Sequence, residues 1–155
     1  MEKIHNYING ELKTPTSNQY LDNYDPSTGA IYSLIPDSDQ HDVHEAVAAA
    51  REAFAGWSGL SVEKRSSFLQ RIGELIDRDL DALALAESID SGKTVALAKS
   101  LDIPRASANM RFFATGAIHF ASEAHVTGAE AVNYTLRTPL GVAGCISPGA
   151  TDAPR

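Results

Sequence analysis

Residues 43–57 read VHEAVAAAREAFAGW and predict an amphipathic helix. The apolar side chains recur at steps of four, three, four and three, which places them on one face of a helix. These residues are Val43, Val47, Ala50, Phe54 and Trp57. Asp39 is the expected N-cap, and Gly56 with the Ser58–Gly59 pair marks the end. We expect the apolar face to pack on a sheet.

Two further helical segments follow this helix. The first begins near Ser61 and stops at Gly92, a residue suited to the left-handed position just past a helix end. The second carries Pro104 in its first turn, where the missing N–H costs nothing. Helical spacing predicts one buried face with Phe68, Leu69, Ile72, Leu75, Ile76, Leu80 and Leu83, and another with Ala106, Met110, Phe113, Ala117 and Phe120.

Strand patterns lie on both sides of the helices. Asn9–Gly10 predicts the turn of a first hairpin, and residues 20–24 and 31–35 predict a second one around Pro26 and Gly29. Residues 132–137 alternate apolar and polar, as in a strand with one wet face. The apolar run at 140–146 is typical of a strand buried on both faces of a parallel sheet. The sequence therefore predicts an α/β fold.

Composition limits the classes of protein. The chain has 155 residues, of which 43% are hydrophobic and 21% charged, which is typical of a soluble globular protein. The net charge of -7, with no basic stripe, argues against a nucleic-acid partner. No apolar run reaches the length of a membrane span. A single cysteine excludes an internal disulfide, so we expect a cytoplasmic location.

Residues 91–94 (SGKT) contain the Gly-Lys-Thr of a phosphate-binding loop. That motif needs a second glycine five residues before Gly92 and a strand leading in, whereas position 87 is Glu and a helix leads in. A turn at a helix end is the preferred interpretation. Glu87 and Asp90 are expected on solvated helix faces.

Two other residue types raise the question of a catalytic or metal site. His41 and His44 have i, i+3 spacing, but no third ligand accompanies them, so we predict solvated side chains and no metal site. Cys145 is a candidate nucleophile by type. Its neighbours supply neither a base nor a positive charge, which favours a small residue of a buried strand.

Six segments occur in order along the chain: 7–11 (YINGE), 24–29 (YDPSTG), 46–57 (AVAAAREAFAGW), 87–93 (ESIDSGK), 111–114 (RFFA) and 139–148 (PLGVAGCISP). Together they resemble the amino-terminal region of the aldehyde dehydrogenase superfamily. Residues 101–105 (LDIPR) are similar to the hydroxymuconic and aminomuconic semialdehyde dehydrogenase branch.

The resemblance implies a division of the chain. Residues 1–120 would be the N-terminal part of a Rossmann-type cofactor-binding domain, 121–140 the hairpin of an oligomerisation arm, and 141–148 the start of the dinucleotide-binding sheet. In that arrangement Ile146, Ser147 and Pro148 would line the NAD or NADP cofactor beside its nicotinamide end. Asp102 matches a position that helps to hold a monovalent cation in some relatives, although a plain surface charge is our preferred interpretation.

The resemblance also implies a reaction. In the family, which forms homo-oligomers, a cysteine thiolate attacks the aldehyde, hydride passes to the nicotinamide, and a glutamate-activated water hydrolyses the thioester. That cysteine and glutamate lie downstream in complete members. The oxyanion-stabilising asparagine of a Trp-Asn pair is replaced here, since Gly149 and Ala150 occupy those positions.

We therefore expect no catalytic residue in this chain. It would be an N-terminal fragment that is inactive alone and does not bind the cofactor, with an aberrant end at 149–155 that arises from a frameshift or an artificial terminus. A different class of function is a non-catalytic interaction module, in which the strand at 132–137 pairs with the sheet edge of a full-length partner.

Overall fold

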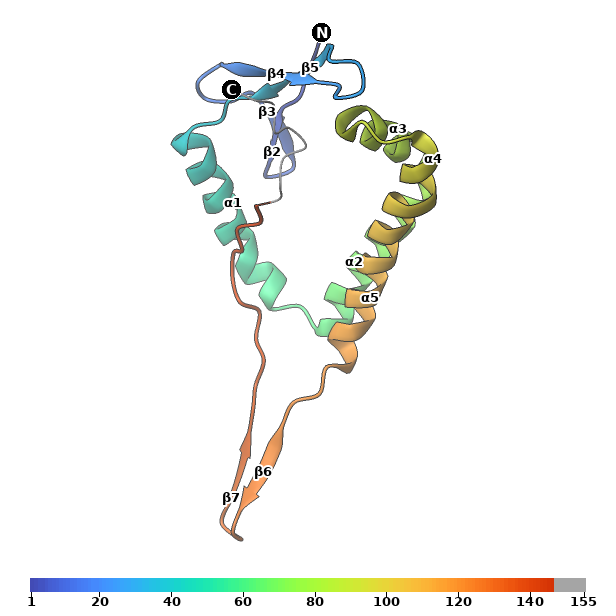
Figure 1. Cartoon of the computed structure of the whole chain (residues 1–155). Helices are drawn as coiled ribbons and strands as arrows, with labels where there is room; N and C mark the ends of the chain where they lie inside the picture. Colours follow the sequence, from blue (N-terminus) through green and yellow to red (C-terminus); the bar gives the residue numbers. More distant parts are fainter. Residues whose placement is uncertain (147–155) are drawn as a thin grey trace.

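The computed structural model describes residues 1–146. Helices and strands follow one another from the first hairpin to a final one, and they surround an open centre (Figure 1). In chain order the elements are β1 (Glu2–Lys3), β2 (Asn6–Ile8), β3 (Glu11–Lys13), β4 (Tyr20–Tyr24), β5 (Ile31–Pro36), α1 (Gln40–Ser58), α2 (Val62–Arg78), α3 (Leu80–Ser91), α4 (Val95–Leu97), the π-helical turn η1 (Ala98–Asp102), α5 (Ile103–His119), β6 (Ala124–Thr127) and β7 (Ala131–Tyr134). The fold mixes helices and strands, as the sequence predicted.

The first two predicted hairpins are confirmed. Asn9 and Gly10 have φ angles of 52° and 82°, the left-handed pair that a tight two-residue turn requires, and Ile8 is paired with Glu11 across it. Strands β4 and β5 pair antiparallel around the turn at 25–29. Strand β1 adds to the other edge of β5 in parallel, so this sheet has the order β1-β5-β4.

The starts of α1 and α2 follow the predicted caps. The Asp39 carboxylate accepts a 2.7 Å hydrogen bond from the backbone N–H of His41, and the Asp42 carboxylate accepts a 3.0 Å bond from the backbone N–H of Asp39. This reciprocal pair is a capping box, which satisfies N–H groups that the first helical turn leaves free. Ser61 caps α2 by accepting from the N–H of Lys64.

The segment between Ser61 and Gly92 forms two helices instead of one. The chain leaves helical geometry at Asp79, which is the C-cap of α2 and the N-cap of α3. The predicted stop at Gly92 is confirmed, because Gly92 is the C-cap of α3 with a φ angle of 74°.

Helices α2 and α5 pack against each other through small residues, which corrects the predicted buried faces. Gly73 on α2 allows the close approach, and the Ser107 hydroxyl donates a 3.1 Å hydrogen bond to the Gly73 carbonyl. Ser107 and Ala114 are 1% and 0% exposed, whereas Phe113 lies in solvent. Close helix contact needs small side chains, so the buried face of α5 is shifted by one position from the apolar stripe.

The last described part of the chain differs most from expectation. Strands β6 and β7 form an antiparallel hairpin that projects away from the helices, with both faces exposed (Figure 1). Residues 140–146 form no strand, so the prediction of a strand buried on both faces is wrong for this chain. A strand of that kind needs neighbours on both edges, and within residues 1–146 no strand pairs with it. In the same part of the chain, no helix is both long and apolar enough to cross a membrane.

Candidate functional site

The residues predicted to line the cofactor do not form a pocket here. The Ile146 side chain is 98% exposed, and Ser147 and Pro148 lie outside the described residues. Cys145 is exposed, so its prediction as a buried strand residue is wrong. Because Ile146 has no second wall opposite it, the described residues do not fit a nicotinamide cofactor.

The best-connected polar group of the chain is the carboxylate of Asp90 on α3. It accepts a 2.6 Å hydrogen bond from the Tyr32 hydroxyl and a 3.3 Å bond from the Asn23 side-chain amide. Asn23 is only 7% exposed, and its amide also donates to the Ser33 hydroxyl at 3.1 Å. The prediction of Asp90 as a merely solvated charge is therefore wrong, since Asp90 joins α3 to the sheet.

Burial and the neighbouring charge act together on Tyr32. Partial burial raises the pKa of the Tyr32 phenol, and its hydrogen bond to the Asp90 carboxylate raises it further. Both effects favour the protonated phenol, which is the form that donates to Asp90. One sequence signal for this cluster is the pairing of two polar residues, because Asn23 and Ser33 are direct register partners across β4 and β5.

The Gly-Lys-Thr segment serves as a helix end, as predicted. The Lys93 ammonium lies 2.8 Å from the Glu87 carboxylate and 2.9 Å from the Asp102 carboxylate. These two hydrogen bonds raise the pKa of Lys93. The Thr94 hydroxyl accepts from the Leu97 N–H and caps α4. Lys93 thus joins the end of α3 to the start of α5, and Glu87, expected to be solvated, is a member of this ion-pair cluster.

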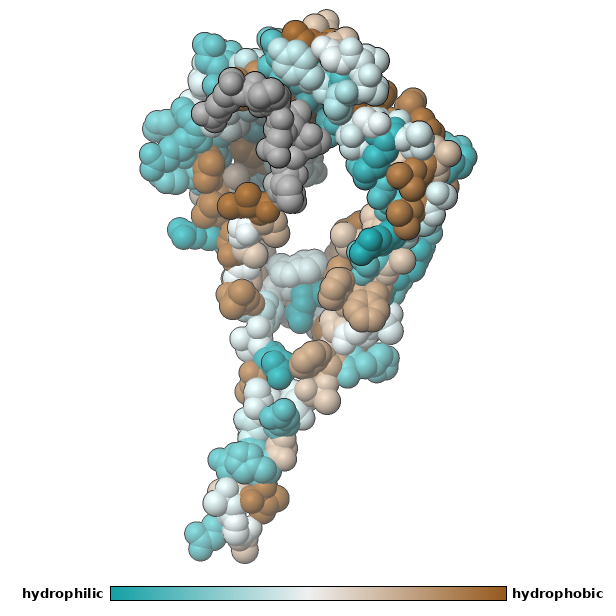
Figure 2. Space-filling view, in the orientation of Figure 1, coloured by the Kyte–Doolittle hydropathy of each residue, from teal (hydrophilic) through white to brown (hydrophobic). Residues whose placement is uncertain are grey.

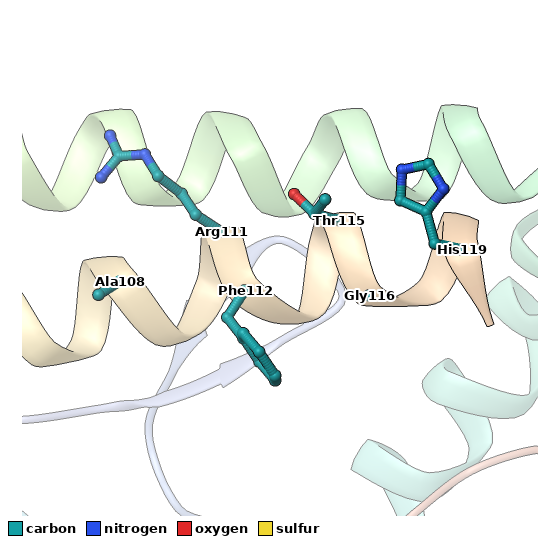
Figure 3. Close-up of a pocket in the computed structure, with 6 residues that line it drawn as sticks. All are labelled: Ala108, Arg111, Phe112, Thr115, Gly116 and His119. Carbon is teal, nitrogen blue, oxygen red and sulfur yellow. The ribbon is translucent and has the colours of Figure 1, made fainter.

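An open hollow of about 600 Å³ runs along α5 beside α2 (Figure 3). Arg111 is already engaged, since its guanidinium lies 2.6 Å from the Asp77 carboxylate and also contacts Ser107. Phe112 points away from Arg111 (Figure 3). Thr115 accepts a long hydrogen bond of 3.4 Å from Gln70. The polar groups of this hollow face α2 and do not converge on a common point, so the hollow has no evident chemistry.

The histidines and acids do not gather into a metal centre in the described range. His41 and His44 lie on the exposed first turns of α1, and the His44 ring is 3.4 Å from the Gln40 amide. No group of three His, Cys, Asp or Glu side chains with ligand-like placement occurs within residues 1–146.

A second hollow, of about 620 Å³, is bounded by apolar side chains from four parts of the chain. We call it the aromatic groove and define it by Phe54 and Trp57 of α1, Leu69 of α2, Phe120 after α5, and Leu136 after β7. Trp57 stacks on Phe68 with ring centroids 5.7 Å apart. The guanidinium of Arg137 lies 4.6 Å from the centre of the Phe120 ring. An apolar groove with a cation at its rim is typical of a docking surface.

Comparison with known proteins identifies the family. The model of the aldehyde dehydrogenase family matches residues 13–148. The chain is 47% identical over 146 residues to a 2-aminomuconic semialdehyde dehydrogenase of Bos taurus, covering 94% of this chain and 30% of that protein. It is 33% identical over 148 residues to a 5-carboxymethyl-2-hydroxymuconate semialdehyde dehydrogenase of Escherichia coli, covering 96% of this chain and 31% of that protein. The chain thus spans about a third of the length of these relatives.

Solved structures agree with the sequence relatives. PnpE in complex with nicotinamide adenine dinucleotide aligns with a TM-score of 0.81 and 29% identity, covering 84% of this chain and 27% of that one. An apo indole-3-acetaldehyde dehydrogenase aligns with a TM-score of 0.85 and 26% identity, covering 91% of this chain and 33% of that one. The architecture is the amino-terminal part of the aldehyde dehydrogenase fold, and the chain belongs to the aldehyde dehydrogenase family.

Proposed function

We propose that this chain is the amino-terminal part of an NAD(P)-dependent aldehyde dehydrogenase that acts on a semialdehyde, and that it does not catalyse the reaction by itself. The 47% identity to a 2-aminomuconic semialdehyde dehydrogenase supports the first half of the proposal. The setting of Cys145 supports the second half. Cys145 is the one cysteine of the sequence, it is exposed, and it makes no side-chain hydrogen bond or ion pair within residues 1–146.

The chemistry explains why that setting matters. Oxidation of an aldehyde through a thioester needs a thiolate nucleophile, a base for the hydrolytic water and a donor for the oxyanion. A thiolate is stabilised by a nearby cation, by a helix N-terminus or by a paired base, and none of these contacts Cys145 in the described part of the chain. Cys145 is therefore not a candidate for the nucleophile.

The cofactor would be held only after residues 141–148 join a sheet. We infer that this segment is the first strand of the dinucleotide-binding sheet, in which Ile146, Ser147 and Pro148 would orient the nicotinamide end. A bound nicotinamide cofactor would supply the hydride acceptor. Two solved relatives that contain NAD support NAD in preference to NADP. The chain alone leaves Ile146 in solvent, so we expect it not to bind the cofactor.

We propose a separate role for the projecting hairpin. Residues 121–140 would be an oligomerisation arm of a cytoplasmic homo-oligomer. Both faces of β6 and β7 are exposed, and each strand has one edge without a partner in the described structure. An unpaired edge is a template for another strand. The same observation favours the second candidate function, in which the chain is a non-catalytic module that pairs with a full-length aldehyde dehydrogenase through residues 131–134.

One assay tests the main proposal. The purified chain, with NAD and then with NADP, is given 2-hydroxymuconic semialdehyde or acetaldehyde, which the names of two relatives specify as substrates. We expect no formation of reduced cofactor. A rate that scales with the chain and disappears in Cys145→Ser would contradict the proposal. Co-purification of the chain with an intact aldehyde dehydrogenase, lost on replacing residues 131–134 by glycines, would support the interaction module instead.

A further inference from the structure

The surface of this chain is too large for a compact protein of its size. The chain exposes 11622 Å². A compact monomer of 16.6 kDa exposes about 7,600 Å². The excess of about 4,000 Å² lies in the range of obligate interfaces, about 2,000–5,000 Å². Hydrophobic residues, drawn in brown, lie on both sides of the central opening (Figure 2). The open faces therefore have the size of an interface and not of ordinary surface variation.

The aromatic groove is the organised part of this excess surface. It combines side chains from α1, α2, the end of α5 and the segment after β7, so a partner that fills it would hold four elements together. Its volume is about 620 Å³, enough for several large side chains. Phe120 is 64% exposed and Trp57 is 40% exposed. Buried aromatic anchors contribute much of the affinity of protein interfaces.

Charge and length decide between two occupants. The chain carries a net charge of -7, so two copies repel each other at neutral pH and low salt. The chain spans 30% of the length of the bovine relative. A polypeptide with the other part of the same fold would bring apolar surface to the groove, and Arg137 at the groove rim would meet an acidic side chain on that partner.

We propose that the aromatic groove docks the part of an aldehyde dehydrogenase fold that lies outside this chain, and that it does so even when that part is supplied as a separate polypeptide. The identity of the partner rests on the proposed function, whereas the position of the interface does not. Docking fills the groove with apolar side chains, removes Trp57 and Phe120 from water and leaves Phe112 on the opposite side of α5 outside the interface.

The test is a binding experiment with a defined probe. The partner is the portion of the bovine 2-aminomuconic semialdehyde dehydrogenase outside the aligned 30%. The full chain is labelled with 5-fluorotryptophan at Trp57, its one tryptophan, so that fluorine NMR reports on the groove without interference from the partner. We expect a complex of one chain with one partner and a shifted Trp57 resonance. Sedimentation of the two polypeptides, alone and mixed, gives the stoichiometry and the Kd.

Two variants of one residue type form a matched pair. Phe120→Asp places a charge in the groove, and we expect the Kd to rise at least about tenfold. Phe112→Asp places the same charge on the same helix segment at a residue of similar exposure, 68% against 64%, and we expect a change of less than about threefold. Circular dichroism of each variant checks that the helices persist. Because neither side chain is buried, neither change removes a core contact.

The outcomes separate docking from activity. No binding by the unmodified chain, an equal loss in both variants, or a homodimer that Phe120→Asp breaks apart would each overturn the docking proposal. A one-to-one complex that responds to Phe120→Asp but forms no reduced cofactor from the semialdehyde would support docking and contradict the proposed function. A complex that also regains turnover would support both.

Discussion

The Tyr32 hydroxyl on β5 donates a 2.6 Å hydrogen bond to the Asp90 carboxylate on α3, and the two residues are 58 positions apart in sequence. Beside this bond, the turn at 25–29 lies on the end of α3. A Cβ atom at Gly92 would come within 3.2 Å of the Pro26 ring. The first sheet is therefore fastened to the helices at the end of α3 by one charged hydrogen bond and one close backbone contact.

Removal of the Tyr32 hydroxyl should loosen this connection. We expect Tyr32→Phe to lower the free energy of local opening of β4, β5 and the end of α3 by about 1 kcal/mol, since a hydrogen bond to a charged group is lost at a partly exposed position. Amide hydrogen exchange measures this opening residue by residue. Tyr24→Phe is the control, because the Tyr24 hydroxyl is 3.5 Å from Asp22 on an exposed face. An equal effect of both changes would contradict the role of the Tyr32–Asp90 bond.

The contact between α2 and α5 depends on the lack of a side chain at Gly73. A Cβ atom there would meet the Arg111 side chain at 3.2 Å and the Ser107 carbonyl at 3.4 Å. We expect Gly73→Leu to separate the helices and to lower protection of the α2 and α5 amides by at least about 2 kcal/mol, because overpacking of a tight contact is costly.

Gly116→Leu is the matched control for Gly73→Leu. Gly116 also lies within a helix, but a Cβ atom there would meet nothing within 4 Å. We expect Gly116→Leu to stabilise α5 by about 0.5–1 kcal/mol, since leucine has the higher helix propensity. Exchange protection of the α5 amides reports both changes. A loss of protection at Gly116→Leu as large as at Gly73→Leu would contradict the packing argument.

Asp42 should make the start of α1 sensitive to acid. Hydrogen bonds from the backbone N–H groups of Asp39 and Thr16 hold the pKa of Asp42 below its ordinary value of 3.8. A carboxyl group with a lowered folded pKa contributes stability that is present above the ordinary pKa and is lost as pH falls through the folded value. We therefore expect protection of residues 14–18 and of the first turn of α1 to be constant above about pH 5 and to fall below about pH 4.

Asp42→Asn should remove that dependence. Its side chain cannot accept all of the hydrogen bonds that reach Asp42 from Thr16 and Asp39, so we expect lower protection at pH 7 and a difference from the unmodified chain that shrinks below about pH 4. Asp37→Asn is the control, because Asp37 contributes its backbone carbonyl and not its carboxylate to Ser17. A difference that stays constant down to pH 3 would contradict the assigned cause.

Local signals predicted the element borders well. Asp39, Ser61 and Gly92 were each identified from residue type and spacing, and each has the predicted capping role in the structure. Caps depend on hydrogen bonds within one turn of the helix, so the sequence around the border contains the necessary information. The hairpin at Asn9–Gly10 was predictable for the same reason.

Contacts between distant segments were harder to predict. The stripe from Ala106 to Phe120 was expected to be buried, but close packing against Gly73 selects Ser107 and Ala114 instead. The cluster around Asp90 was missed because its donors, Asn23 and Tyr32, come from a different part of the chain. Periodicity identifies an apolar face but does not show which neighbour is close enough to contact it.

The unfolding of the isolated chain should reflect its open architecture. The described residues share no single core, and large apolar side chains such as Phe113, Phe120 and Leu140 lie in solvent. A cooperative transition requires that most of the buried surface be lost in one step. We expect differential scanning calorimetry of the monomer to show a broad, weak transition, with a heat well below the roughly 0.7 kcal/mol per residue of compact proteins. Addition of the docking partner should sharpen the transition, because binding stabilises only the folded arrangement. A sharp transition with full heat in the unbound monomer, verified by sedimentation, would show that the sheet and helices already form one cooperative unit.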